Sequence, residues 1–166
     1  LVQARALYRD LIDRAPDNAD AWHLFGVAAH QQGARELAVD LIEGAIRLNG
    51  DAADYHSNLG MVLKALGRED DAGAALERAI ELDAHHAKAL ANLAGIRRGQ
   101  GRFEDALALA ERAVAAGPED AETHNNLGNA VKDLGRAEDA VTAYARAVDL
   151  APDYALGHWN LSLALL

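Results

Sequence analysis

The sequence predicts an all-α fold, a helical solenoid in which about ten helices stack as repeated helix pairs. The first observation behind this prediction is a period of 34 residues, at which four glycines recur: Gly33, Gly67, Gly101 and Gly135. The second is a set of alanines with the same period: Ala38, Ala72, Ala106 and Ala140, and Ala45, Ala79, Ala113 and Ala147. The third is an apolar stripe in each half of the repeat, at the spacing of an amphipathic helix.

The unit at residues 53–86 shows how one helix pair is encoded. Its first helix is predicted by an apolar stripe at i, i+3, i+4 and i+7, made of Leu59, Val62, Leu63 and Leu66. Gly67 interrupts this pattern. An acidic run then begins at Glu69, which favours the positive end of a second helix. The stripe of that second helix consists of Ala72, Leu76, Ala79 and Ile80.

The period divides the chain into whole and partial units. Complete helix pairs are predicted at 19–52, 53–86, 87–120 and 121–154. Residues 1–16 match a second helix without its first helix, and residues 155–166 match a first helix without its second. We therefore expect residues 1–166 to form a single array that belongs to a longer protein.

Composition argues against several classes of function. A net charge of −10 is the opposite of what a general nucleic-acid-binding protein needs. There is no cysteine for disulfides or thiolate metal sites. No apolar run of about 18 residues is present, so we expect no membrane insertion and a cytoplasmic location. No phosphate-binding loop or nucleophile elbow occurs, and the serines, Ser57 and Ser162, lack a partner base. We thus expect no catalytic residues and no cofactor in this segment.

The motifs of the units resemble those of tetratricopeptide repeats. The resemblance rests on residues 22–26 (Trp-His-Leu-Phe-Gly), residues 126–128 (Asn-Leu-Gly) and the later glycines and alanines, and it covers essentially the whole chain. It implies a right-handed superhelix whose first helices line a concave face that binds proteins or peptides. Ala94 and Ser162 depart from the pattern, because Gly26, Gly60 and Gly128 stand at the equivalent positions.

The third unit is predicted to be a weak point of the array. Its first helix carries Gly95 and Gly99, and Arg97 occupies a column that is apolar in the other units. Each glycine in a helix interior costs about 1 kcal/mol relative to alanine.

A column of asparagines on the first helices is a candidate peptide-binding surface. Its members stand one residue before a core leucine: Asn58, Asn92, Asn126 and Asn160. Side-chain amides both donate and accept hydrogen bonds, so such a row can hold the backbone of an extended peptide. The alternative is that each amide bonds a neighbouring helix.

A basic column is a second candidate for the same groove. It consists of His30, Lys64, Arg98 and Lys132. A basic strip within an acidic chain favours an acidic or phosphorylated segment. The alternative is that these are solvated cations near helix C-termini, which the helix dipole favours.

The histidines are expected to be structural. His56, His124 and His158 share a column with Trp22 and Leu90, where a bulky half-buried side chain fits. Metal binding needs ligands that converge on one point, whereas this column places one residue in each unit. The sequence therefore predicts no metal site.

The two ends carry apolar residues where a solenoid normally has polar caps. The residues expected to mediate self-association are Leu1, Tyr8, Ile12, Leu163 and Leu166. One hypothesis is head-to-tail homo-oligomerisation, in which the C-terminal half-unit accepts the N-terminal half-unit of the next molecule. The alternative is that a longer chain supplies the missing helices.

Three functions follow from these observations. The first is a non-catalytic scaffold that binds a protein or peptide in its concave groove. The second rests on residues 56–60, 124–128 and 152–166, which resemble repeats of O-linked N-acetylglucosamine transferases and of bacterial repeat proteins with a glycosyltransferase-like domain. That resemblance implies a substrate-recruiting arm, with any catalytic domain after Leu166. The third function is self-assembly through the two ends.

Overall fold

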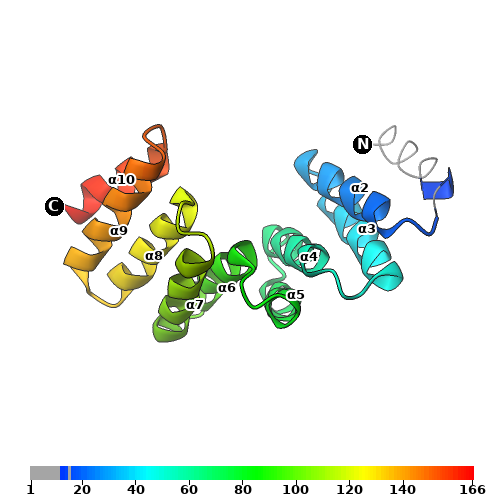
Figure 1. Cartoon of the computed structure of the whole chain (residues 1–166), viewed down its shortest axis with the longest axis horizontal. Helices are drawn as coiled ribbons and strands as arrows, with labels where there is room; N and C mark the ends of the chain where they lie inside the picture. The colour runs from blue at the N-terminus through cyan, green and yellow to red at the C-terminus, as the bar shows by residue number, and fades with distance from the viewer. Residues whose placement is uncertain (1–11, 15) are drawn as a thin grey trace. The chain divides into compact units, whose positions relative to one another are not determined.

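The computed structural model describes residues 12–14 and 16–166, and all of the regular secondary structure within them is α-helical (Figure 1). The first helices of the repeats are α2 (Ala19–Gln31), α4 (Ala53–Ala65), α6 (Ala87–Gly99), α8 (Ala121–Asp133) and α10 (Ala155–Ala164). The second helices are α3 (Arg35–Leu48), α5 (Glu69–Leu82), α7 (Phe103–Ala116) and α9 (Ala137–Leu150). The predicted all-α helical-repeat fold is confirmed.

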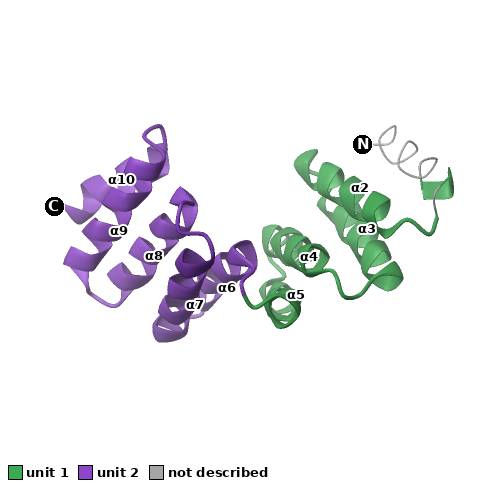
Figure 2. Ribbon diagram, viewed as in Figure 1, with its two compact units in different colours: residues 1–84 green, residues 85–166 purple. Residues whose placement is uncertain are grey.

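The helices form two compact units, residues 1–84 and residues 85–166 (Figure 2). In unit 1, α2 pairs with α3 and α4 pairs with α5, while α3 also packs on α4. In unit 2, α6 pairs with α7 and α8 pairs with α9, while α7 packs on α8 and α10 packs on α9. The first helices α6 and α8 also touch. A single array from residue 1 to residue 166 stays a prediction.

The first helices α2, α4, α6 and α8 each end in a turn that explains the periodic glycine. Gly67 has φ = 77°, a left-handed conformation that side chains with a Cβ rarely adopt. The amide of the following residue, Arg68, donates a hydrogen bond of 3.0 Å to the Leu63 carbonyl, which closes the helix end. The later arginines of the column repeat this bond, Arg102 to the Arg97 carbonyl at 2.9 Å and Arg136 to the Val131 carbonyl at 3.1 Å. The 34-residue glycine spacing therefore marks the corner of every helix pair.

The second glycine column allows close packing within a pair. A Cβ on Gly128 would lie 2.5 Å from a ring carbon of Tyr144, and one on Gly60 would lie 2.6 Å from Cγ of Leu76. Both of these large side chains are fully buried. In the third helix pair, α6 and α7, the corresponding position is Ala94, and the residue 16 positions later is the small Ala110 rather than a leucine or tyrosine. The departure at Ala94 is thus matched by a smaller partner.

Replacing Gly99 by alanine is expected to stabilise unit 2 by up to about 1 kcal/mol, because alanine has the higher helix propensity. Gly99 is the last residue of α6, its φ is not positive, and an added Cβ would meet nothing within 4 Å. Urea unfolding of the variant measures the gain. A loss of stability would contradict the prediction that glycine weakens this helix.

Candidate functional site

The asparagine column divides into two kinds of residue. Asn58 on α4 donates from Nδ2 to Nε2 of His23 on α2, at 2.7 Å. Asn160 on α10 donates from Nδ2 to Oδ1 of Asn125 on α8, at 2.8 Å. In each case the amide joins two neighbouring first helices. At these two positions the asparagine therefore bonds a neighbouring helix, which is the alternative to peptide binding.

Asn92 on α6 and Asn126 on α8 are different, since neither amide makes a hydrogen bond within unit 2 as described. Both side chains are half-buried. The partner of a paired asparagine stands 35 residues earlier, and for Asn126 that residue is Ala91, which has no polar side-chain atom. Unit 2 thus presents two free amides on neighbouring first helices.

The offset of 35 residues is general for polar contacts between neighbouring first helices. Tyr55 donates to the carboxylate of Asp20, again between α4 and α2. Arg98 on α6 forms an ion pair with Asp133 on α8, with Nε 2.7 Å from Oδ2. These pairs are not apparent at the 34-residue period, because their members stand 35 residues apart. Complementary polar residues at that offset are the signal in the sequence that indicates them.

A polar cluster joins α2 and α4 in unit 1. The rings of His23 and Tyr55 stack with centroids 4.5 Å apart. Burial lowers the pKa of His23 below its ordinary value of 6.5, against the opposing effect of the Asp54 and Asp20 carboxylates. Burial, assisted by the hydrogen bond to Asp20, raises the pKa of Tyr55 from 10.0 to about 12. Both shifts favour the neutral side chains in the folded state.

We expect the stability of unit 1 to fall as the pH drops below about 6.5 and again as it rises above 10. Below 6.5 the unfolded chain binds a proton at His23 that the folded chain resists. Above 10 the unfolded chain loses the Tyr55 proton while the folded chain keeps it. Urea unfolding across pH, followed by Trp22 fluorescence in a Trp159→Phe background, measures this dependence. An unchanged acid limb in His23→Gln would contradict the assignment.

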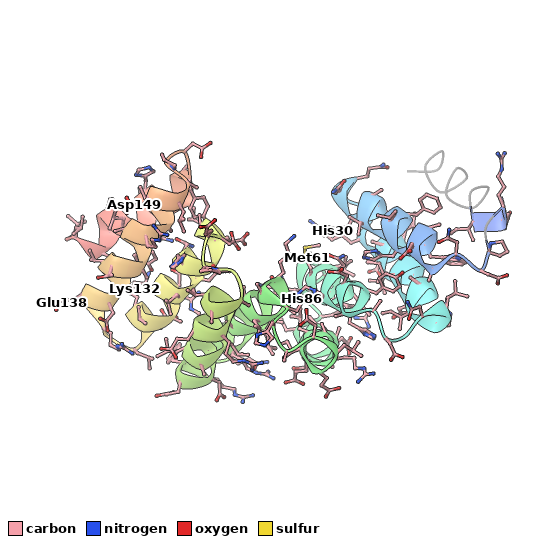
Figure 3. The ribbon with its side chains drawn as sticks, viewed as in Figure 1. His30, Met61, His86, Lys132, Glu138 and Asp149 are labelled. Atoms are coloured by element: carbon pink, nitrogen blue, oxygen red, sulfur yellow. The ribbon has the colours of Figure 1, made fainter. Side chains whose placement is uncertain are left out.

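The members of the basic column lie in the last turns of the first helices α2, α4, α6 and α8. Lys64 and Lys132 are exposed and make no ion pair within the described residues, whereas Arg98 is neutralised by Asp133. His30 is half-buried, and its Nδ1 has no hydrogen-bond partner within the described part of the chain. Figure 3 shows Lys132 on α8 and His30 on α2.

The histidine column has a repeated structural contact. Nε2 of His56 donates to the Gly50 carbonyl at 2.9 Å, six residues earlier. His124 and His158 make the same bond to Pro118 and Pro152, each at 2.9 Å. Each ring therefore ties the start of a first helix to the preceding loop. Across the described residues, no three His, Asp or Glu side chains form a group suited to a metal ion.

The residues expected to mediate self-association stand at the two ends of the chain. Leu1 and Tyr8 lie outside the described residues, and Ile12 is half-buried. Leu163 on α10 is 47% exposed, and Leu166, which follows the end of that helix, is fully exposed. Trp159 is 61% exposed on the same helix, which the sequence analysis did not single out.

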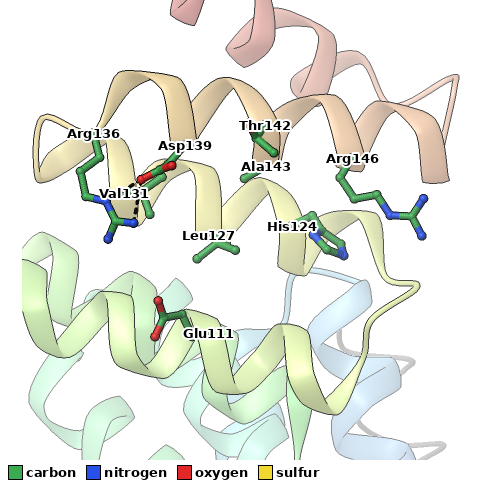
Figure 4. Close-up of a pocket in the computed structure, with 9 residues that line it drawn as sticks. All are labelled: Glu111, His124, Leu127, Val131, Arg136, Asp139, Thr142, Ala143 and Arg146. Atoms are coloured by element: carbon green, nitrogen blue, oxygen red, sulfur yellow. Dashed lines mark hydrogen bonds and ion pairs between the residues drawn. The ribbon is translucent and has the colours of Figure 1, made fainter.

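A pocket that the sequence analysis did not predict lies on unit 2 and has a cavity volume of about 350 Å³. Its floor is formed by Leu127 and Val131 of α8 and Ala143 of α9 (Figure 4). Glu111 of α7 and Arg146 of α9 line it as well. Glu111, Leu127 and Arg146 repeat at 34-residue spacing, whereas Arg97 and Leu109 stand 34 residues before Val131 and Ala143. Nothing in the sequence shows that the pocket residues enclose a space.

Comparison with known families decides the identity of the repeat. One family model described as tetratricopeptide repeat matches residues 3–53, 92–155 and 125–166, and a second such model matches residues 51–119. The chain belongs to the tetratricopeptide repeat family. This confirms the family expected from the sequence motifs. Among curated proteins, no sequence matches the chain significantly.

Solved structures of other repeat proteins share the fold. MamA has a TM-score of 0.77 at 22% identity, over 92% of this chain and 88% of its own. PilF of Pseudomonas aeruginosa has a TM-score of 0.82 at 22% identity, over 89% and 67% of the two chains. YrrB, described as a TPR protein with an unusual peptide-binding site, has a TM-score of 0.72 at 24% identity, over 93% and 79%. At these identities the likeness concerns the fold.

No helix within the described residues combines the length and apolar character that crossing a lipid bilayer requires.

The tetratricopeptide repeat fold is typical of proteins that bind other proteins along the surface of a helical array. The family therefore supports a general role as a protein-interaction scaffold. The place where a partner would bind has to be inferred from the side chains of each unit.

Proposed function

We propose that unit 2 binds an extended segment of a partner protein along its first helices, with Asn92 and Asn126 holding the peptide backbone. The observation that carries this proposal is the pair of free, half-buried amides on the adjacent helices α6 and α8. The polar atoms of both amides are accessible to solvent, so a ligand can reach them without breaking a hydrogen bond of the fold. A peptide backbone supplies both the donors and the acceptors that such an amide needs.

The basic column contributes unequally to this proposed site. Lys132, at the end of α8, is exposed and unpaired, so it adds attraction for an acidic peptide. Arg98 already neutralises Asp133, and its guanidinium is therefore less available to a ligand. Lys64 and His30 belong to unit 1, where Asn58 is bonded to His23. Peptide binding is accordingly proposed for unit 2 first.

Replacing both Asn92 and Asn126 by alanine is expected to weaken the binding of a peptide selected against the whole chain by roughly tenfold. This loss corresponds to two hydrogen bonds of about 0.5–1.5 kcal/mol each. Fluorescence anisotropy with the labelled peptide measures the affinity, and circular dichroism checks that helicity is kept.

The matched control is Asn58→Ala, which removes a bond between two helices. This variant is expected to lose about 1 kcal/mol of unfolding free energy while keeping the affinity. An unchanged affinity in the double variant of Asn92 and Asn126 would refute the proposal.

Self-association through the ends is a second proposed function, supported by the exposed Leu163 on α10 and the exposed Leu166 just after it. In this proposal α10 of one molecule accepts residues 1–16 of the next. Sedimentation velocity over a concentration series tests it, because Leu163→Glu should abolish any concentration-dependent increase in size. A monomer at all concentrations would refute it.

The role as a substrate-recruiting arm of a glycosyltransferase is a further proposal. It is tested by the sequence after Leu166, where this proposal predicts a nucleotide-sugar-binding domain.

A further inference from the structure

The pocket of unit 2 opens on a different side of α8 from the free amides. Asn126 stands one residue before Leu127, which places the two side chains about 100° apart around the helix. His124, Leu127 and Val131 follow each other at helical spacing and all line the pocket. A ligand in the pocket would therefore meet other residues than a peptide held by Asn92 and Asn126.

Two charged residues of the pocket lack a partner. Arg136 is held by Asp139, with Nη2 2.7 Å from Oδ2, and the Thr142 hydroxyl donates to the Glu138 carbonyl at 3.0 Å. By contrast, Glu111 and Arg146 are exposed and make no hydrogen bond or ion pair with any described residue. Glu111 belongs to α7 and Arg146 to α9, with the apolar floor from α8 between those helices (Figure 4).

Unit 1 carries most of the same residues but pairs its arginine with its own acids, and Leu63 and Ala74 stand where the pocket has Val131 and Thr142. The equivalent residues, 68 positions earlier, include Glu43, His56, Leu59, Arg68, Asp71 and Arg78. Nη1 of Arg78 lies 3.0 Å from Oε2 of Glu81, and Nη2 lies 3.6 Å from Oδ1 of Asp51. The corresponding acids in unit 2 are Asp149 and Glu119, and Arg146 pairs with neither. The repeat itself therefore does not require the arginine to be free.

We propose that this pocket binds a segment of a partner protein in which a bulky apolar side chain stands between an acidic and a basic residue. The apolar side chain would cover Leu127, Val131 and Ala143, which form the floor. The acidic residue would pair with Arg146 and the basic residue with Glu111, so that opposite charges meet at both walls. This inference is independent of the amide site, because it uses another side of α8.

Fluorescein-labelled peptides with a central Trp, and with Glu and Lys on either side at varied spacing, are suitable probes for the full chain. Fluorescence anisotropy should show saturable binding by at least one spacing. Its analogue with Gln in place of Glu should bind roughly tenfold more weakly, as expected for the loss of one charge-assisted hydrogen bond. No saturable binding by any spacing would overturn the proposal.

Arg146→Ala should weaken binding of the same peptide roughly tenfold, whereas the matched variant Arg78→Ala should leave it unchanged. Arg146 is exposed, so the variant should keep its helicity. Thr142→Tyr, which fills the pocket from α9, should also abolish binding. Equal affinity in Arg146→Ala and the unaltered chain would overturn the proposal.

The location of binding separates this site from the amide site. Amide resonances of Leu127, Val131 and Ala143 should shift on peptide addition, and Asn92→Ala together with Asn126→Ala should leave the affinity unchanged. Shifts confined to α6 near Asn92, or a dimer that Arg146→Ala dissociates without peptide, would overturn the proposal in favour of the amide site or a second copy.

Discussion

Tyr144→Ala is expected to lower the unfolding free energy of unit 2 by about 3–5 kcal/mol, the cost of removing a large buried aromatic side chain. Tyr144 is fully buried on α9 and forms a core cluster with Val131 and Ala140. Its hydroxyl donates to Oδ1 of Asn129 at 2.9 Å. The substitution therefore leaves a cavity and an amide oxygen without its partner.

Urea unfolding followed by Trp159 fluorescence measures this loss in unit 2, in a Trp22→Phe background. Tyr144→Phe is the matched control, and it should cost only about 1 kcal/mol because the ring is kept. Adding Gly128→Ala to Tyr144→Ala should recover part of the loss, since it recreates the small pair that Ala94 and Ala110 form in the third unit. A loss below 1 kcal/mol for Tyr144→Ala would contradict the packing described here.

Gly60→Val is expected to lower the unfolding free energy of unit 1 by about 3 kcal/mol, at the upper end of the usual cost of overpacking. A Cβ at this position would lie 2.6 Å from Cγ of the fully buried Leu76. It would also lie 3.1 Å from the backbone oxygen of Ala72, which cannot rotate away. Helices α4 and α5 would have to separate to admit the side chain.

Gly99→Val is the control for Gly60→Val, because it makes the same change in a helix where the new Cβ meets no atom within 4 Å. Trp22 fluorescence during urea unfolding, in a Trp159→Phe background, reports on unit 1, and Leu76→Ala should partly rescue Gly60→Val. Equal effects of the two valine substitutions would indicate that helix propensity, rather than close packing, explains the glycine column.

The period predicted the helices and their corners because backbone requirements repeat strictly along the chain. Gly67 and its equivalents are needed for a left-handed turn, and a sequence pattern registers that need directly. Ala94 stands where the other helix pairs have a glycine, and this departure could be understood only when the residue facing it was known. Its neighbour across the pair, Ala110, is small, so packing depends on two positions together.

The candidate site was harder to predict, since hydrogen-bond partners come from neighbouring helices. In the sequence the asparagines form one column with a common spacing. In the structure Asn160 is hydrogen-bonded to Asn125, whereas alanine occupies the position that would supply a partner for Asn126. The pocket was missed because Arg78 and Arg146 are the same residue type in the same column. Only the reach of each side chain toward nearby acids distinguishes them.

The most direct test of the proposed function is to follow the side-chain NH₂ resonances of the asparagines while a selected peptide is added to the ¹⁵N-labelled chain. The signals of Asn92 and Asn126 should shift with the same saturation curve, because these amides would bond the peptide backbone. Those of Asn58 and Asn160, which already join neighbouring helices, should stay in place. Saturable binding with no movement of the Asn92 and Asn126 signals would contradict the proposal.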